Sequence, residues 1–197
     1  MADIEARYEF RVWGENLSEL RARLNRRATP VKSSSSETYL VSWKTDECNV
    51  KIRGDAIEIK LLIAEYRGLE QWKPVLKAAF PLDQSSVADV LLPALEIHPL
   101  QLSRSRYELN EFFNEVIRTQ PDIAIAEVGK TRFRFSLGVC LAEFTLVLFK
   151  DARCQTVAIE SADPDELLRL IHEIGLVGAD NLSYVRYIKH SLRLGKS

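Results

Sequence analysis

The sequence predicts an α+β fold in which an antiparallel sheet closes, or nearly closes, into a tunnel-like β-barrel with helices packed on the outside. Strand-like segments in both halves of the chain alternate between charged and apolar residues, so each would carry one charged and one apolar face. Two of these segments flank Gly54-Asp55, a turn typical of hairpins. If such strands close on themselves, the apolar faces contact the helices outside and the charges line the interior.

The chain has 197 residues, of which 46% are hydrophobic and 28% charged. This length suits one domain with a large core or two small domains closely packed, and we expect a single domain over 1–197. A net charge of −1 gives no global basic field, so no DNA partner is expected. No stretch is long and apolar enough to span a membrane, and the N-terminus lacks a signal-peptide pattern, so a cytoplasmic location is expected.

The three cysteines, Cys48, Cys140 and Cys154, are widely spaced and form no Cys-x-x-Cys pair. No histidine lies near them at metal-ligand spacing. We therefore expect reduced thiols that are buried or half-buried.

The first strand is expected over 5–12, where the alternation is strict. One face carries only charge, and the other is apolar: Glu5, Arg7, Glu9 and Arg11 against Ala6, Tyr8, Phe10 and Val12. A helix is expected over 17–27 because Leu17, Leu20 and Leu24 form an apolar stripe, and Pro30 ends it. Its other side carries Arg21, Arg23, Arg26 and Arg27, which either meet a phosphate or form a solvated face.

Residues 32–36 are rich in serine and are expected to form a mobile loop. Alternation then returns from residue 37 and continues through two strands, 49–53 and 56–63, that form the hairpin. Their charged faces carry Lys51, Arg53, Glu58 and Lys60. The stretch 66–118 is a connection that the patterns leave largely unassigned, because Pro74 interrupts a helix-like spacing. Within it we expect a helix ending near Pro93 and another over 107–118.

The second half returns to strands, with an apolar stretch over 123–128, then Gly129, then an alternating stretch over 130–135, followed by 142–149 and 154–161. Lys130, Arg132 and Arg134 share one face of the alternating stretch, and Glu143 lies on the charged face of the next strand. Asp163 and Pro164 predict the start of a helix that ends at Gly175. A final helix is expected over 183–194.

This order of charged strands resembles the CYTH, or triphosphate tunnel, superfamily. The matching pieces are Tyr8-Glu9-Phe10-Arg11, Val50-Lys51-Ile52-Arg53 before a strand that ends at Lys60, and Lys130-Thr131-Arg132. The tail is similar too, with Val157-Ala158-Ile159-Glu160-Ser161, a capped helix, Gly175-Leu176 and Ser183-Tyr184. The resemblance runs from about residue 5 to residue 192.

The resemblance implies an eight-stranded tunnel that holds a triphosphate or polyphosphate anion on lysines and arginines. Carried over residue by residue, the phosphate ligands are Arg7, Arg11, Lys51, Arg53, Lys60, Lys130, Arg132 and Arg134. Glu9, Glu143 and Glu160 would bind Mg²⁺ or Mn²⁺. Members of the superfamily hydrolyse triphosphates or cyclise ATP, so the resemblance also raises metal-dependent hydrolysis of a nucleoside triphosphate, polyphosphate or triphosphorylated RNA end.

Three positions depart from the family pattern. Arg7 stands where the first glutamate of Glu-x-Glu-x-Lys belongs, Val147 stands near an expected acidic position, and Ala158 replaces the first carboxylate near the end. Arg11 also stands where the family has a lysine, so the compact charge of an ammonium group is replaced by a planar guanidinium with several hydrogen-bond donors. The loss of carboxylates predicts weak metal binding and weak hydrolysis, because metal-assisted phosphoryl transfer needs that ion. The resemblance supports the tunnel better than the enzyme.

Two other hypotheses stay open. A degenerate tunnel could serve as a non-catalytic scaffold or interaction subunit that contacts a protein partner, or a second copy, through Trp13, Trp72 and the helix that carries Tyr184 and Tyr187. An open antiparallel sheet with one solvent-exposed face would also explain the alternation of charged and apolar residues. The sequence has no nucleophile constellation, zinc-ligand spacing or glycine-rich phosphate loop.

Overall fold

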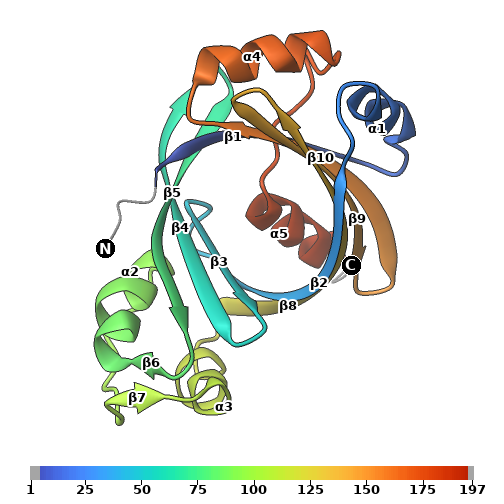
Figure 1. Cartoon of the computed structure of the whole chain (residues 1–197). Coiled ribbons are helices and arrows are strands. Elements are labelled where there is room, and N and C mark those ends of the chain that lie inside the picture. The colour runs from blue at the N-terminus through green and yellow to red at the C-terminus, as the bar shows by residue number, and fades with distance from the viewer. Residues whose placement is uncertain (1–4, 195–197) are drawn as a thin grey trace. The chain divides into compact units, whose positions relative to one another are not determined.

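The computed structural model describes residues 5–194. Its eight long strands form a closed antiparallel barrel in the order β1-β10-β9-β8-β2-β3-β4-β5. Their bounds are β1 Arg7–Gly14, β2 Val31–Ser42, β3 Cys48–Arg53, β4 Ala56–Tyr66, β5 Leu69–Ala79, β8 Ile123–Leu137, β9 Cys140–Phe149 and β10 Ala152–Ser161 (Figure 1). The predicted fold class, an α+β antiparallel barrel, is confirmed.

The chain divides into two compact units, and each is described by itself. The first unit holds the described residues within 1–36, 62–73 and 128–183, and the second holds those within 37–61, 74–127 and 184–197. The assignment of 1–197 to one domain stays a prediction.

The first unit is built on β1, β10, β9 and the second half of β8. Its antiparallel register places Phe10 opposite Ile159 and Val157 opposite Phe144, all on one face. Helix α4 (Pro164–Glu173) contacts β10 and β9, and its Leu167 joins this face in a single buried core (Figure 1). The short helix α1 (Ser18–Asn25) adds Leu24 to the same core. The apolar face of this sheet is therefore the face that the helices cover.

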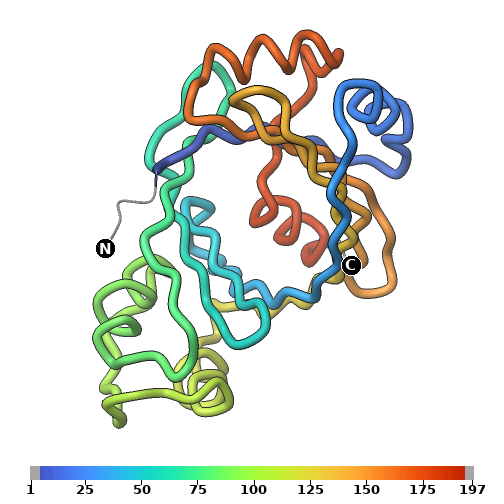
Figure 2. The backbone as a smooth tube through the Cα atoms, in the orientation of Figure 1, coloured from blue at the N-terminus to red at the C-terminus, as the bar shows by residue number. Residues whose placement is uncertain are grey.

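Helix α4 begins and ends as its sequence predicts. The Asp163 side chain accepts hydrogen bonds from the backbone N–H of Asp165 at 2.9 Å and of Glu166 at 3.1 Å. Gly175 follows the helix at φ +76°, a conformation that side chains rarely adopt. Figure 2 follows the chain from β9 through a tight turn into β10 and then into this helix.

The second unit contains the β3–β4 hairpin. The register pairs Lys51 with Glu58 and Ile52 with Ile57, and Gly54 makes the turn at φ +61°. The apolar face, with Val50 and Ile52, packs in a core with residues of two helical segments. These segments are π-helix η1 (Ser86–Leu91) with α2 (Leu92–Ala94), and α3 (Leu109–Glu111) with π-helix η2 (Phe112–Ile117). The two helices expected in the middle of the chain are thus present.

Two regions differ from the sequence predictions. The serine-rich segment 32–36 is not a loop but part of β2, where Ser34 and Ser35 hydrogen-bond to Thr131 and Arg132 of the first unit. The stretch around Pro74 is strand β5. A two-stranded sheet of β6 (Leu82–Asp83) and β7 (Arg106–Tyr107) and the C-terminal helix α5 (Tyr184–Leu194) complete the elements.

The cysteines are free thiols, as predicted, with Cys48 and Cys140 buried and Cys154 half-buried. Burial raises the pKa of the Cys48 thiol to about 12, although the ammonium of Lys189 opposes the shift. Among the described helices, none has the length and apolar character needed to cross a membrane.

The cap of α4 gives a test of the local analysis. Asp163→Ala removes the acceptor of two backbone N–H groups, so the free energy of unfolding should fall by about 1 kcal/mol. Urea denaturation measures this, with Asp151→Ala, in an exposed turn, as the matched control. A loss no larger than that of the control would contradict the assignment of the cap.

Candidate functional site

The polar face of the first unit collects charged residues from four adjacent strands. In register across them lie Arg11 of β1, Ala158 of β10, Glu143 of β9 and Arg134 of β8. Two residues earlier on β1, Glu9 lies directly opposite Glu160 of β10. Since directly opposed residues on a sheet are close neighbours, residues from both ends of the chain share one surface.

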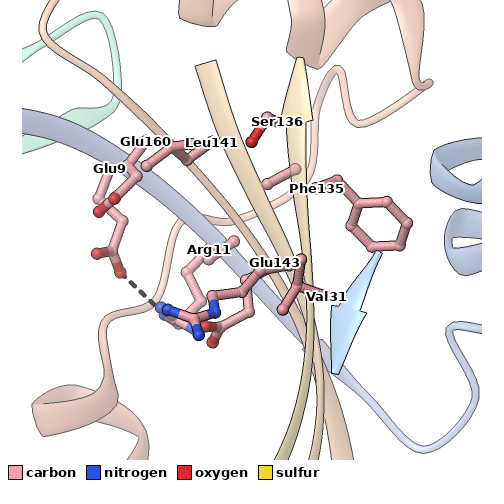
Figure 3. Close-up of a pocket in the computed structure, with 11 residues that line it drawn as sticks. Glu9, Arg11, Val31, Phe135, Ser136, Leu141, Glu143 and Glu160 are labelled. Atoms are coloured by element: carbon pink, nitrogen blue, oxygen red, sulfur yellow. Dashed lines mark hydrogen bonds and ion pairs between the residues drawn. The ribbon is translucent and has the colours of Figure 1, made fainter. Parts of the chain in front are cut away.

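A cavity of about 390 Å³ opens on this face, a size typical of small-ligand pockets. Five of the predicted site residues line it: Glu9, Arg11, Arg134, Glu143 and Glu160. Figure 3 shows the ion pair between Glu9 and Arg11 as a dashed line, with Glu160 and Glu143 among the other residues that line the cavity. Ala158 and the largely exposed Val31 add apolar surface.

Arg11 is the most deeply buried of the cavity's charged residues, with 6% of its surface exposed. Its Nε donates to Glu9 Oε1 at 2.9 Å, and its Nη1 lies 3.4 Å from Thr156 Oγ1. The Thr156 hydroxyl donates to the carbonyl of Val12 at 2.7 Å, so its oxygen is oriented to accept from Arg11. A buried guanidinium requires such partners, because an unpaired buried charge is strongly destabilising.

Arg132 is held in a similar way. Its Nη1 donates to Ser35 Oγ at 2.6 Å, and its Nε lies 3.4 Å from Glu143 Oε2. The other oxygen of Glu143 accepts from the Thr145 hydroxyl at 2.7 Å. Glu143 is therefore fixed between a guanidinium and a hydroxyl group.

Two further arginines complete this cluster. Arg7 Nη1 lies 3.4 Å from Glu160 Oε1, with both side chains partly exposed. Arg134 is exposed and lines the cavity, and its side chain forms no hydrogen bond or ion pair with any residue within 5–194. The structure thus brings together seven predicted residues: Arg7, Glu9, Arg11, Arg132, Arg134, Glu143 and Glu160.

Lys130 is buried on the same strand, but it does not line this cavity. It lines a second hollow of about 450 Å³ together with Glu15 and Gln155. Lys130 therefore belongs to the polar face without contributing directly to the pocket.

Glu70 is a residue that the sequence reasoning missed. It lies on β5 directly opposite Glu9, is 4% exposed, and accepts a hydrogen bond from the indole N–H of Trp72 at 3.1 Å. Glu70, Glu9 and Glu160 consequently occupy neighbouring positions on three strands. The sequence of β5 does not alternate regularly between polar and apolar residues around Pro74, so it gave no strand signal that would have placed Glu70.

Asn181 fixes β1 beneath the cavity. Its side-chain oxygen accepts from the Arg11 backbone N–H at 2.8 Å, and its amide nitrogen donates to the carbonyls of Glu9 at 3.2 Å and Gly68 at 2.9 Å. The next residue, Leu182, donates its backbone N–H to the carbonyl of Arg11 at 2.9 Å. Asn181 is thus a positioning residue for Glu9 and Arg11.

The three predicted phosphate ligands of the second unit lie on the polar face of its hairpin. Lys51 pairs with Glu58 at 3.0 Å, and Arg53 lies 3.7 Å from the buried carboxylate of Glu37. Lys60 shares this face. Lys51 and Arg53 line a hollow of only about 20 Å³, room for about one water molecule.

The donor set does not fit a divalent metal ion. Within residues 5–194, no three His, Cys, Asp or Glu side chains are grouped so that they could hold one. Each predicted ligand is paired with a guanidinium: Glu9 with Arg11, Glu143 with Arg132 and Glu160 with Arg7. A cation would have to displace these arginines, so the metal assignment of Glu9, Glu143 and Glu160 stays a prediction that this geometry does not favour.

The aromatic residues expected on contact surfaces are mostly covered. Trp72 and Tyr184 are buried, and Tyr184 stacks on Tyr39 with ring centroids 5.4 Å apart. The Trp13 indole donates to the carbonyl of Leu182 at 2.8 Å, and Tyr187 is half-buried. Both rings pack within their own units, so this geometry does not favour Trp72 or Tyr184 as contact residues, and a contact surface on Trp13 or the helix with Tyr187 stays a prediction.

Three of the four arginines in and just after α1 have partners within the first unit. Arg23 donates to the carbonyl of Ile174 at 2.8 Å, Arg27 pairs with Glu173 at 2.7 Å, and Arg21 lies over the Phe133 ring at 4.0 Å. These contacts tie α1 to α4 and to the sheet.

No protein-family model matches the chain, and no curated protein is similar to it in sequence. Solved structures match it in fold. A conserved hypothetical protein from Pyrococcus furiosus is 15% identical with a TM-score of 0.55, over 92% of this chain and 98% of that chain. The PH1012 protein from Pyrococcus horikoshii is also 15% identical, with a TM-score of 0.52 over the same shares. A Bacillus halodurans protein provisionally named an adenylate cyclase is 6% identical, with a TM-score of 0.51 over 93% of this chain and 98% of that one.

Likeness at these identities shows the fold alone. These neighbours share the fold of the closed eight-stranded antiparallel barrel, which is the architecture that the resemblance of the charged strands implies.

The role of Asn181 can be tested by Asn181→Ala. The change removes three hydrogen bonds, each contributing roughly 0.5–1.5 kcal/mol, so the free energy of unfolding should fall by about 2 kcal/mol. Urea denaturation measures the loss, with Asn25→Ala, at the exposed end of α1, as control. Equal stability of the two variants would contradict a positioning role.

Glu58 gives a pH-dependent test in the second unit. Burial raises the pKa of its carboxyl, but Lys51, Lys60 and Lys77 together outweigh burial, so the pKa lies below the usual 4.5. A lowered folded-state pKa means that ionised Glu58 stabilises the fold above pH 4.5 and loses this effect as the pH falls through the folded-state pKa. The stability difference between wild type and Glu58→Gln should therefore be full at pH 7 and shrink in acid. A difference that stays constant down to pH 3 would show that the expected coupling is absent.

Proposed function

We propose that the cavity of the first unit binds a phosphate-rich anion, namely a nucleoside triphosphate, a polyphosphate or a triphosphorylated RNA end. The observation that carries this proposal is Arg134, a cation on the cavity wall that makes no hydrogen bond or ion pair to the described residues. A guanidinium offers a planar fork of donors that matches phosphate oxygens. Arg134 is therefore available for an anion without the loss of an existing partner.

The neighbouring buried arginines strengthen this argument. Arg11 and Arg132 lie on the same face, 6% and 8% exposed, and their hydrogen bonds to Glu9 and Ser35 fix their orientation. Groups that are fixed before a ligand arrives lose little entropy when it binds. Buried charges also interact more strongly with an anion, because the surroundings are less polar than water.

The fold supports the same class of ligand. The resemblance of Lys51, Arg53, Lys60 and Lys130 to phosphate-holding residues keeps them as predicted ligands. The fold neighbour provisionally named an adenylate cyclase would act on ATP, which is itself a triphosphate. Hydrolysis is not part of the proposal, because the carboxylates that would hold Mg²⁺ or Mn²⁺ are paired with arginines.

Isothermal titration calorimetry with tripolyphosphate and with ATP tests the proposal. Wild-type protein should bind both anions, and Arg134→Ala should weaken binding about 10-fold to 100-fold, the effect of losing a charged hydrogen bond of about 1.5–3 kcal/mol. Higher salt should weaken binding as well.

Arg26→Ala is the matched control, because Arg26 is an exposed arginine of the same unit at the end of α1, outside the cavity. It should bind as wild type does. Equal affinity of the Arg134 variant and the wild type, or no binding by the wild type, would overturn the proposal.

A further inference from the structure

The carboxylates around the cavity are already neutralised within the protein. Glu9 contacts Arg11 at 2.9 Å, and Glu160 and Glu143 each lie 3.4 Å from a guanidinium. Glu143 also accepts the Thr145 hydroxyl. Each of the three predicted metal ligands, Glu9, Glu143 and Glu160, thus already has a positive partner.

The register of β1 explains how this arises. Residues two apart on a strand share a face, so Arg7 and Arg11 lie on either side of Glu9. Glu9 itself has Glu160 on one neighbouring strand and Glu70 on the other. Three adjacent carboxylates would repel one another, and the two flanking guanidinium groups offset that repulsion.

Ala158 removes a further donor from the same surface. It lies in register between Arg11 and Glu143, lines the cavity, and is 6% exposed. A methyl group there offers no oxygen to a metal ion, and Mg²⁺ requires near-octahedral oxygen ligands, several of them water or phosphate. The surface is thus rich in fixed guanidinium groups and poor in available carboxylate.

We infer that this cavity supplies its own counter-cations, so that it binds the free polyphosphate anion in preference to its magnesium complex. The inference rests on the proposed function, and it specifies the form of the ligand. Arg7, Arg11 and Arg132 form ion pairs with the carboxylates that would otherwise bind a metal ion. Arg134 adds positive charge to the cavity wall. Magnesium lowers the negative charge of the polyphosphate, so it competes with the arginines for the same oxygens.

The first experiment is calorimetry with tripolyphosphate in EDTA and in excess Mg²⁺. We expect binding in EDTA and an affinity at least about tenfold weaker in Mg²⁺, or about 1.4 kcal/mol. Binding that requires Mg²⁺, or is tightened by it, would overturn the inference while leaving the proposed function intact. No binding in either solution would overturn the proposed function and the inference with it.

A second experiment needs no anion. Without polyphosphate, Mg²⁺ should leave the Tm of the wild type unchanged, whereas the double variant Arg7→Glu with Ala158→Glu should gain a Tm that rises with Mg²⁺, because a bound ligand stabilises the folded state. Arg26→Glu, which makes the charge change of Arg7→Glu at the end of α1, should stay insensitive. A rise in the wild-type Tm would contradict the inference.

Ala158 is buried, so a glutamate there could prevent folding. Arg7→Glu alone, at a position whose side chain is 41% exposed, repeats the test in a variant that should fold. It frees Glu160 from its guanidinium and adds a carboxylate beside it, and its Tm should rise with Mg²⁺. A folded Arg7→Glu protein whose Tm ignores Mg²⁺ would show that arginine pairing is not what excludes the metal.

Discussion

The ion pair between Arg11 and Glu9 is the interaction on which the polar face of the first unit depends. Both residues lie on β1, the pair is 2.9 Å apart, and Arg11 is almost completely buried. The other face of the strand carries Phe10 and Val12 into the core beneath α4. Because a shift of one residue would bury Arg11 among apolar side chains and expose Phe10, the register is strongly fixed. That register aligns Arg11 with Ala158 and Glu9 with Glu160.

The same constraint connects distant parts of the sequence. Asn181, which follows α4, holds the backbone at Glu9 and Arg11, so the end of the first unit's chain positions its beginning. Arg132 reaches Ser35 of β2. Hydroxyl groups of Thr145 and Thr156 hold a carboxylate and a guanidinium in place. The cavity is therefore a network in which most charged groups have an assigned partner and Arg134 remains available.

Much of the fold could be predicted because its signals are local. The alternation of β1 and of the segment with Lys130 and Arg132, the turn at Gly54, and the cap at Asp163 each depend on a few neighbouring residues. The predicted cluster of arginines and glutamates follows from the same alternation, because charged residues two apart in the sequence share one face of a strand. Antiparallel pairing then brought those faces together.

The failures have a different physical origin. Serines 33–36 have no strand preference of their own, and they form part of β2 where Ser35 hydrogen-bonds to Arg132, a partner 97 residues away. Pro74 suggested an interrupted helix, which concealed β5 and with it Glu70. The pairing of each carboxylate with an arginine could not be predicted either, because it depends on side-chain reach between strands. For this reason the sequence is compatible with a metal site that the geometry does not favour.

Arginine Nε–H resonances in ¹⁵N-labelled protein give the most direct measurement of the central claim, that fixed guanidinium groups of this face bind a polyphosphate. Tripolyphosphate would be added in EDTA while these resonances are followed by NMR. The account predicts that the Arg11, Arg132 and Arg134 signals shift in a saturable manner while the Arg26 signal does not. Shifts confined to exposed arginines such as Arg26, or shifts that appear only after Mg²⁺ is added, would contradict it.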